Sequence, residues 1–217
     1  MKRKILKFFV FLFVSVVVLL FGVYYFMDES LPEGVEGEHA EQLADEMLAA
    51  LNKPGFDSLE YISFTFKGLH TIKWDLENDT ATVIWSDNEV TIDLGKSMND
   101  FTMLEFKAYE YFINDTFWLV APFKVRDDGV VRSFMNVPNG RGLLVTYTKG
   151  GVTPGDSYLW ILDDRGFPIA WKLWVDIIPV GGLKFTWEDW QEYEDVWFSQ
   201  LHKNTFLDLE VSELEVR

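Results

Sequence analysis

The chain contains no cysteine, which excludes disulfides, thiol catalysis and cysteine-ligated metal sites. Histidine is scarce, and none of His39, His70 and His202 stands at the spacing of a zinc motif. No serine lies in a Gly-x-Ser-x-Gly elbow, and no glycine pair matches a phosphate-binding loop. We therefore expect no cofactor, no metal site and no catalytic residue of these classes.

Basic residues are few compared with acidic ones. The chain has 19 Lys and Arg against 35 Asp and Glu, a net charge of −16 at neutral pH. Four of the basic residues, Lys2, Arg3, Lys4 and Lys7, precede the first apolar segment, so the remainder is more acidic still. Such a surface is repelled by phosphate backbones and by anionic lipid head groups. Nucleic acid is not expected as a partner.

One long segment has no charge at all. Residues 8–27 consist mostly of Phe, Leu and Val. As a helix rising about 1.5 Å per residue, this length covers about 30 Å, the thickness of a bilayer's hydrocarbon core. The basic residues before it and Asp28 and Glu29 after it predict a cytoplasmic N-terminus. The sequence thus predicts a single-pass membrane anchor with the rest of the chain on the periplasmic or extracellular side.

The apolar segment has two alternative interpretations, a cleaved signal peptide and a buried core helix. A cleaved signal peptide has an apolar region of about 7–15 residues that ends in a small-x-small site. The apolar run is longer here, and no such site follows Gly22. A buried core helix would not be expected to lack charge over this length.

The chain divides into three parts on composition. Residues 1–27 hold the anchor, and residues 28–37 are acidic with Pro and Gly, which predicts a short flexible linker. Residues 38–217 have the size of one domain with its own core.

Hydrophobic periodicity within that domain indicates a mainly β fold. Apolar residues recur at helical spacing in 38–52 and in 99–113, and an apolar run at 117–122 ends in proline and predicts a buried segment crossing the core. Alternation at period two predicts antiparallel strands within 61–66, 71–76, 81–85, 90–94, 143–147, 158–162, 169–175, 183–187 and 205–211. We expect an α+β, mainly β fold: a strongly curved antiparallel sheet or half-open barrel covered by helices, preceded by one transmembrane helix.

The second half of the anchored domain carries motifs similar to a known family. The segments YFINDTFWLVAPFK at 111–124, TPGDSYLWILDD at 153–164 and PIAWK at 168–172 resemble passages of LolA-like bacterial proteins. The whole pattern resembles the periplasmic lipoprotein-carrier fold of the LolA and LolB type. That resemblance implies a half-open barrel that binds a lipid or the acyl chain of a lipoprotein. Classical carriers are soluble or lipid-anchored, so a transmembrane anchor departs from the family.

Aromatic residues supply candidates for lining such a cavity. The chain has nine tryptophans, all outside the apolar segment, and Trp is seldom fully buried because of its bulk. Most candidates share a strand face with other apolar groups, and one lies in the apolar run. The candidate ligand-binding residues are Phe64, Trp74, Trp85, Trp118, Trp160, Trp171 and Trp187. A plain aromatic core would show the same pattern.

Two other functions remain open at this point. Acidic residues crowd between Trp187 and Trp197, and paired carboxylates beside aromatics are typical of glycoside hydrolases, although a solvated acidic face is the simpler interpretation. An anchored interaction module would bind a protein or a glycan through exposed aromatic residues. The position of the tryptophans discriminates among the three: around an apolar cavity, on an exposed patch, or above paired carboxylates.

Overall fold

The computed structural model describes residues 7, 9–16, 22, 25, 27–138, 140–149 and 154–217. Within these residues, no helix is both long enough and apolar enough to cross a bilayer. Residues 8, 17–21, 23, 24 and 26 of the predicted anchor lie outside the described part. The anchor therefore stays a prediction.

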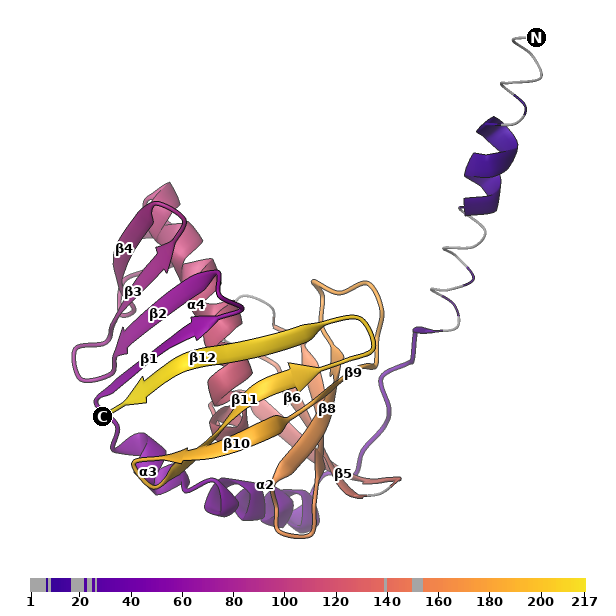
Figure 1. Cartoon of the computed structure of the whole chain (residues 1–217). Coiled ribbons are helices and arrows are strands. Elements are labelled where there is room, and N and C mark those ends of the chain that lie inside the picture. Colours follow the sequence, from indigo (N-terminus) through magenta and orange to yellow (C-terminus); the bar gives the residue numbers. More distant parts are fainter. Residues whose placement is uncertain are drawn as a thin grey trace.

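Two antiparallel sheets form the body of the domain (Figure 1), so the predicted mainly β, antiparallel fold is confirmed. The larger sheet has seven strands in the order β10-β11-β12-β1-β2-β3-β4. Its strands are β1 (Tyr61–Phe66), β2 (His70–Asp75), β3 (Thr80–Trp85), β4 (Asn88–Asp93), β10 (Glu188–Tyr193), β11 (Val196–Lys203) and β12 (Asp208–Val216). The last strand pairs with β1, which joins the C-terminus to the first meander.

The smaller sheet has five strands in sequential order. They are β5 (Val130–Val137), β6 (Gly140–Tyr147), β7 (Ser157–Leu162), β8 (Pro168–Trp174) and β9 (Leu183–Thr186). β7 is buried along its whole length because both of its faces are covered.

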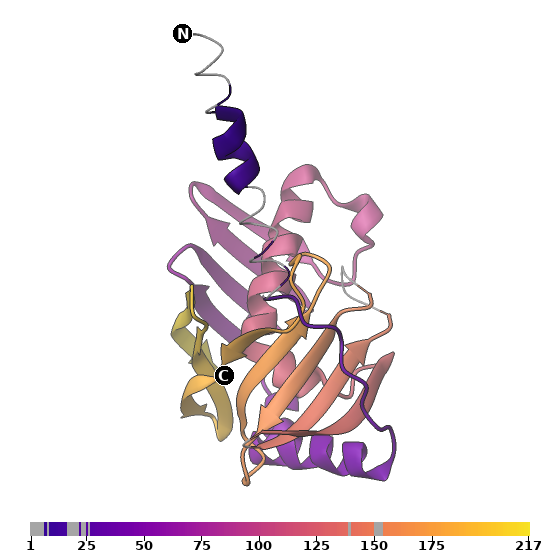
Figure 2. The same cartoon turned by 90° about the vertical axis from the view of Figure 1, so that its right-hand side faces the viewer.

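Among the described residues from 28 onward, three helices and two 3-10 turns complete the fold. They are α2 (Glu38–Ala50), α3 (Lys53–Asp57), η1 (Met98–Asp100), α4 (Met103–Val120) and η2 (Ala121–Lys124). α4 packs against strands of the seven-stranded sheet and reaches the five-stranded sheet through Phe117 and Trp118. α2 closes the lower end of the domain against β5 and β6 in both views (Figures 1 and 2).

Several local expectations are corrected by the structure. The apolar run 117–122 is not a separate crossing segment, because α4 continues through Val120 and the next 3-10 turn, with Pro122 in it, begins at Ala121. Thr102 caps α4 in a capping box with Glu105. The pattern predicted about eight or nine strands, whereas the described residues form twelve; β5, β10 and β11 were missed. β10 was missed because its many exposed carboxylates hide the alternation.

The expected single curved sheet is divided in two, and neither part is closed. The division falls at Trp187, between β9 and β10. The Trp187 amide still donates to the Ile169 carbonyl of β8 at 2.9 Å, and the Lys203 amide of β11 donates to Thr186 Oγ1 at 3.1 Å. Asp189, with φ of 51°, lies in the left-handed region just after this point. The chain therefore passes from one sheet to the other without a long connection.

The segment 28–37 differs from the predicted flexible linker. Asp28 and Glu29 are hydrogen-bonded to Gly181, and Val35 pairs with Phe134 of β5. In Figure 2 this part of the chain runs down the front of the five-stranded sheet to α2. The composition of the segment indicated flexibility, but its partners lie about a hundred residues or more away in sequence and leave no local signal.

The core contains a cluster of tryptophans around one buried histidine. Trp160, Trp171 and Trp187 are each no more than 2% exposed, with ring centroids about 5 Å apart. His202 is fully buried, and its ring centroid lies 4.3 Å from that of Trp187. Burial lowers the pKa of His202 to about 4, and the backbone groups of Thr186 and Trp118 only partly offset this effect. The imidazole is therefore neutral in the folded protein at neutral pH.

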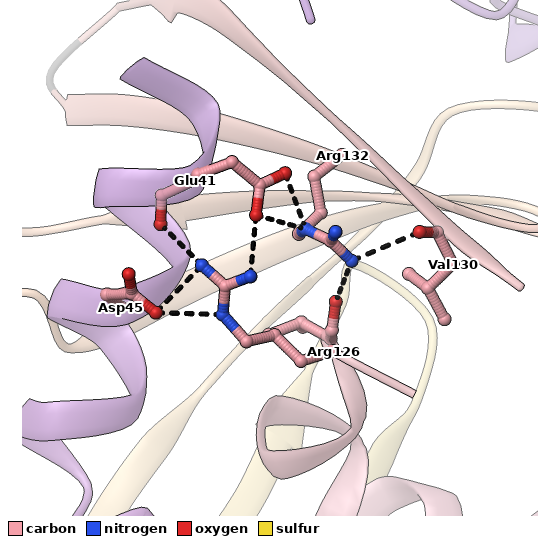
Figure 3. A network of polar contacts seen from close by, with 6 residues as sticks. Glu41, Asp45, Arg126, Val130 and Arg132 are labelled. Carbon is pink, nitrogen blue, oxygen red and sulfur yellow. Dashed lines mark hydrogen bonds and ion pairs between the residues drawn. The ribbon is translucent and has the colours of Figure 1, made fainter. Parts of the chain in front are cut away.

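Arg126 holds α2 to the turn after η2 (Figure 3). Its guanidinium donates to Glu41 Oε2 at 2.6 Å, to the Glu41 carbonyl at 3.0 Å and to Asp45 Oδ1 at 2.8 Å. About a third of the Arg126 side chain is exposed, so water screens these ion pairs.

Arg132 makes the more buried half of the same network. Its Nε donates to both carboxylate oxygens of Glu41, and its Nη1 donates to the carbonyls of Val125 and Val130 at 2.9 and 3.0 Å. Desolvation opposes ionisation of Glu41, but the hydrogen bonds and charges of Arg132 and Arg126 outweigh it and lower its pKa. Glu41 thus joins two arginines from β5 and the preceding turn to α2.

Replacing His202 tests the effect of its burial on stability. Between pH 6.5 and about 4 the unfolded chain binds a proton at His202 that the folded chain does not, so the free energy of unfolding falls as pH drops through this window. A shift of this size is worth about 3 kcal/mol. We expect His202→Phe to remove that part of the acid dependence in chemical denaturation. His39→Phe, at an exposed histidine, is the control, and an unchanged pH dependence in His202→Phe would contradict the assignment.

Arg132→Gln tests the network that joins α2 to β5. The side chain is only 16% exposed, and its loss removes the donor to two backbone carbonyls and one of the two arginines that pair with Glu41. We expect the free energy of unfolding to fall by about 1–3 kcal/mol, the range for hydrogen bonds to charged groups. Lys149→Gln removes an ion pair whose partners are 60% and 91% exposed and should cost under about 0.5 kcal/mol. If both variants lower the free energy of unfolding equally in urea titrations, Arg132 contributes no more to stability than an exposed ion pair.

Candidate functional site

A pocket of about 380 Å³ lies between α4 and the five-stranded sheet. One wall comes from α4 and η2, the other from β6, β7 and β8, and the loop after β8 closes one side. Eight aromatic residues line it: Trp74, Tyr109, Phe112, Phe117, Trp118, Tyr147, Tyr158 and Trp171. Apolar rings dominate the interior of this pocket, as in most small-molecule sites.

α4 contributes a continuous stripe to the pocket. Tyr109, Phe112, Ile113, Thr116 and Val120 recur at the three- and four-residue spacing that places them on one face of a helix. The capping box fixes the start of this helix: the Glu105 amide donates to Thr102 Oγ1, and the Thr102 amide donates to Glu105 Oε2. The register of the stripe is thereby set at its first turn.

A partly buried hydrogen bond between His70 and Asp115 ties α4 to the seven-stranded sheet. His70 Nδ1 on β2 lies 2.7 Å from Asp115 Oδ2, and the His70 ring packs on Tyr111 with centroids 3.9 Å apart. Desolvation raises the pKa of Asp115 to about 6, against the opposing effect of His70. Asp115 is adjacent to the pocket stripe in sequence but faces the sheet, so this pair positions the helix.

The opposite wall is formed by aromatic side chains of the five-stranded sheet. The Trp171 ring lies 5.9 Å from that of Phe117 in a stacked arrangement and 5.1 Å from that of Trp118. Tyr158 packs on both Phe117 and Trp171. Burial raises the pKa of the Tyr158 hydroxyl well above its ordinary value, so this hydroxyl stays neutral at physiological pH.

Indole and hydroxyl groups of the lining residues do not make the pocket polar. Trp74 Nε1, Thr116 Oγ1, Tyr147 OH and Trp171 Nε1 are covered from solvent and have no hydrogen-bond partner among the described residues. Because these atoms are covered, they offer no accessible donor to a ligand. The accessible surface between the rings is therefore mostly apolar.

Charged residues gather near one part of the pocket. Lys124 pairs with Asp127, and Lys149 Nζ lies 2.7 Å from Asp128 Oδ2. All four residues are among those that line the pocket, and Asp127, Asp128 and Lys149 are exposed to solvent. Most of the charged lining residues therefore lie at the rim and the rings inside, with the buried Asp156 as an exception. This distribution suits an amphipathic ligand.

The seven residues expected to line a cavity are distributed between the pocket and the core. Trp74, Trp118 and Trp171 line the pocket. Phe64, Trp160 and Trp187 are at most 2% exposed and pack within the hydrophobic core. Trp85 is half-buried on β3 and packs against Tyr111, with centroids 5.5 Å apart. Alternation along a strand identifies its apolar face but not which ring on that face meets open space.

Sequence reasoning missed most of the helical wall of the pocket. Thr116 and Phe117 were not candidates because the helix was expected to end near residue 113, and a 3.6-residue period continued through 117–120 would have included them. Tyr109 and Ile113 lie within the expected helix at 99–113 but were not candidates, because the cavity lining was expected from the strands and the apolar run. Tyr147 and Tyr158 lie in predicted strands, but the candidates on strands were chosen mainly among tryptophans.

A second pocket, of about 320 Å³, is lined by residues of β10, β11 and β12: Asp189, Gln200, Leu201, Glu210, Val211, Ser212 and Glu213. The acidic run of Glu188, Asp189, Glu192, Glu194 and Asp195 belongs to β10 and its turn. Only Asp189 of this run lines the second pocket, and none of it lines the aromatic pocket. Among the described residues, no group of three or more His, Asp or Glu side chains could hold a metal ion.

Comparisons with known proteins give only a distant likeness. No family model matches this chain, and no curated protein matches it significantly. One solved structure, a DUF1329 family protein from Desulfovibrio piger ATCC 29098, aligns with 82% of this chain and 93% of its own. The two sequences are 9% identical and the TM-score is 0.41. A likeness at this level says nothing about what the chain binds.

Proposed function

We propose that this chain is a membrane-anchored protein whose extracytoplasmic domain binds an apolar ligand, a lipid or an acyl chain. Residues 8–27 span the membrane with the N-terminus in the cytoplasm, and residues 38–217 form the binding domain. The observation that carries the proposal is the aromatic pocket of about 380 Å³ between α4 and the five-stranded sheet. Its volume falls within the range of about 300–1,000 Å³ that ligand pockets occupy.

Burial of hydrocarbon supplies the driving force. Removing apolar surface from water gains about 25 cal/mol per Å², or about 0.8 kcal/mol for each methylene group. The uncharged side chains of Phe117, Tyr158 and Trp171 can contact a ligand that has no hydrogen-bonding group. The charged rim residues Lys124 and Lys149 suit a ligand with a polar end.

The finer architecture that we infer is a half-open barrel. In this interpretation the two sheets act as the barrel wall and α4 as the helix inside its opening, as in the LolA and LolB type of lipoprotein carrier. An anchored protein cannot shuttle freely between two membranes. The function that fits the anchor is holding or handing over a lipid at its own membrane.

One observation favours a second candidate, an interaction module. The amino-terminal end of α4 and the turn before it expose Met98, Met103, Leu104 and Phe106, and Met103 is 91% exposed. Contiguous exposed apolar residues of this kind mark surfaces that bind a partner. This surface is separate from the pocket lining, so the two functions are not exclusive.

Photochemical labelling of the full-length chain in phosphatidylcholine nanodiscs tests the proposed function. We expect a diazirine-bearing fatty acid to label peptides of α4 and β8 around the pocket. Ile113→Trp places a larger side chain in the pocket and should abolish this labelling. Ile169→Trp makes the same change at a partly exposed position outside the pocket and should preserve it.

Thermal unfolding of both variants separates loss of binding from loss of fold. Comparable transitions in the two variants, with labelling lost only in Ile113→Trp, support the pocket as the site. Adducts confined to residues 8–27, or equal labelling of pocket peptides in both variants, would refute it.

A further inference from the structure

The first residues after the predicted span are bound tightly to the domain. The Gly181 amide donates to Asp28 Oδ1 at 2.8 Å, and the Glu29 amide donates to the Gly181 carbonyl at 3.0 Å. Trp174 Nε1 donates to the Glu29 carbonyl at 2.7 Å, and Lys172 Nζ pairs with the Glu29 carboxylate. We call residues 28–35 the strap.

The glycine pair after β8 permits this approach. A Cβ added at Gly181 would lie 2.5 Å from the Glu29 carbonyl oxygen and 2.6 Å from Trp174 Cδ1. Gly182 has φ of +77°, and a Cβ there would lie 2.7 Å from Glu29 Cβ. Any side chain at Gly181 would therefore displace the strap. The contact is specific to the loop between β8 and β9.

The strap determines how far this loop can be from the bilayer. The predicted span ends at Met27, and Asp28 is the next residue, which adds at most about 3.6 Å. The head-group layer extends about 5–8 Å beyond the hydrocarbon on each side. Gly181, hydrogen-bonded to Asp28 and Glu29, must then lie within or beside that layer.

The same loop forms one side of the pocket. Val175, Ile177 and Ile178 line it, and Ile177 is 70% exposed. We propose that the strap holds the β8–β9 loop against the outer leaflet of the membrane that its own anchor spans. The pocket then opens on that leaflet and takes its lipid from there. This inference rests on the proposed anchor and on the proposed lipid site.

The energetics of transfer favour the leaflet as the source of the ligand. A lipid that crosses water to reach a pocket loses about 0.8 kcal/mol for every methylene group exposed on the way. A pocket whose apolar side touches the leaflet avoids that exposure. The ion pair with Lys172 also offsets the charge of Glu29 beside the loop, which lessens repulsion from head groups.

Site-specific fluorescence in liposomes tests the placement. Because the chain has no cysteine, Ile177→Cys and Ala49→Cys each carry a single label site. Ala49 is exposed on α2, at the lower end of the domain in both views, away from the β8–β9 loop (Figures 1 and 2). The full-length variants, labelled with an environment-sensitive fluorophore, are reconstituted in phosphatidylcholine liposomes that contain nitroxide-labelled phosphatidylcholine. We expect the label at 177 to lose fluorescence and the label at 49 to keep it.

A glycine substitution tests whether the strap causes the placement. Gly181→Ala should displace the strap and restore fluorescence at position 177. Gly95→Ala, whose new Cβ would meet only side-chain oxygens, of Asp93 at 3.3 Å and of Asp79 at 3.7 Å, should leave the quenching unchanged. Equal fluorescence at 177 and 49, or quenching at 177 that survives Gly181→Ala, would overturn the proposed role of the strap.

Labelling by a photoactivatable phosphatidylcholine in the same liposomes separates this inference from the lipid site itself. Pocket adducts that disappear in Gly181→Ala support loading from the leaflet. Pocket adducts without quenching at 177 would overturn the placement and leave the proposed function standing. Quenching at 177 without any pocket adduct, from this lipid or from a fatty acid, would overturn both loading and the lipid site.

Discussion

The position of α4 between the two sheets is the constraint on which the candidate site depends. On one side, α4 is held to the seven-stranded sheet by the partly buried pair of His70 and Asp115. Its other side meets the five-stranded sheet where Phe117 and Trp118 pack on Trp171. The pocket lies beside these ring contacts and shares their side chains, so its walls exist only while the helix keeps this place.

Most charged side chains and the apolar pocket lining occupy different parts of the domain. The chain carries a net charge of −16, yet the described pocket is lined mainly by rings, with most of its charged residues toward the rim. The tyrosine hydroxyls in its wall stay neutral because burial raises their pKa. Acidity keeps the outer surface soluble, whereas affinity for hydrocarbon depends on the small surface that faces α4.

Local patterns in the sequence predicted the elements better than their limits or their partners. The meander of β1 to β4 follows the expected strands closely, since alternation and short turns are local signals. The strand β10 was missed because an edge strand rich in exposed carboxylates shows little apolar alternation. The extent of the helical wall depends on where α4 ends. A helix that stops near 113 supplies Tyr109, Phe112 and Ile113, whereas one that continues to Val120 adds Thr116 and Val120 in register. Only three of the seven candidate rings line the pocket. The alternation along a strand predicts which face is buried, whereas contact with a cavity depends on packing between elements distant in sequence.

The contacts of the strap could not be predicted from local sequence patterns either, and they restrict how the anchored domain can be oriented. A flexible linker of ten residues has a root-mean-square span of about 16–19 Å, which would let a tethered domain turn its pocket in any direction. Glu29 instead meets Lys172, Trp174 and Gly181, partners that no local pattern could connect to it. Fixing the chain within two residues of the predicted span removes most of that rotational freedom. In the proposed arrangement, the direction of the pocket is therefore a property of the fold, set by a glycine pair that leaves room for the strap.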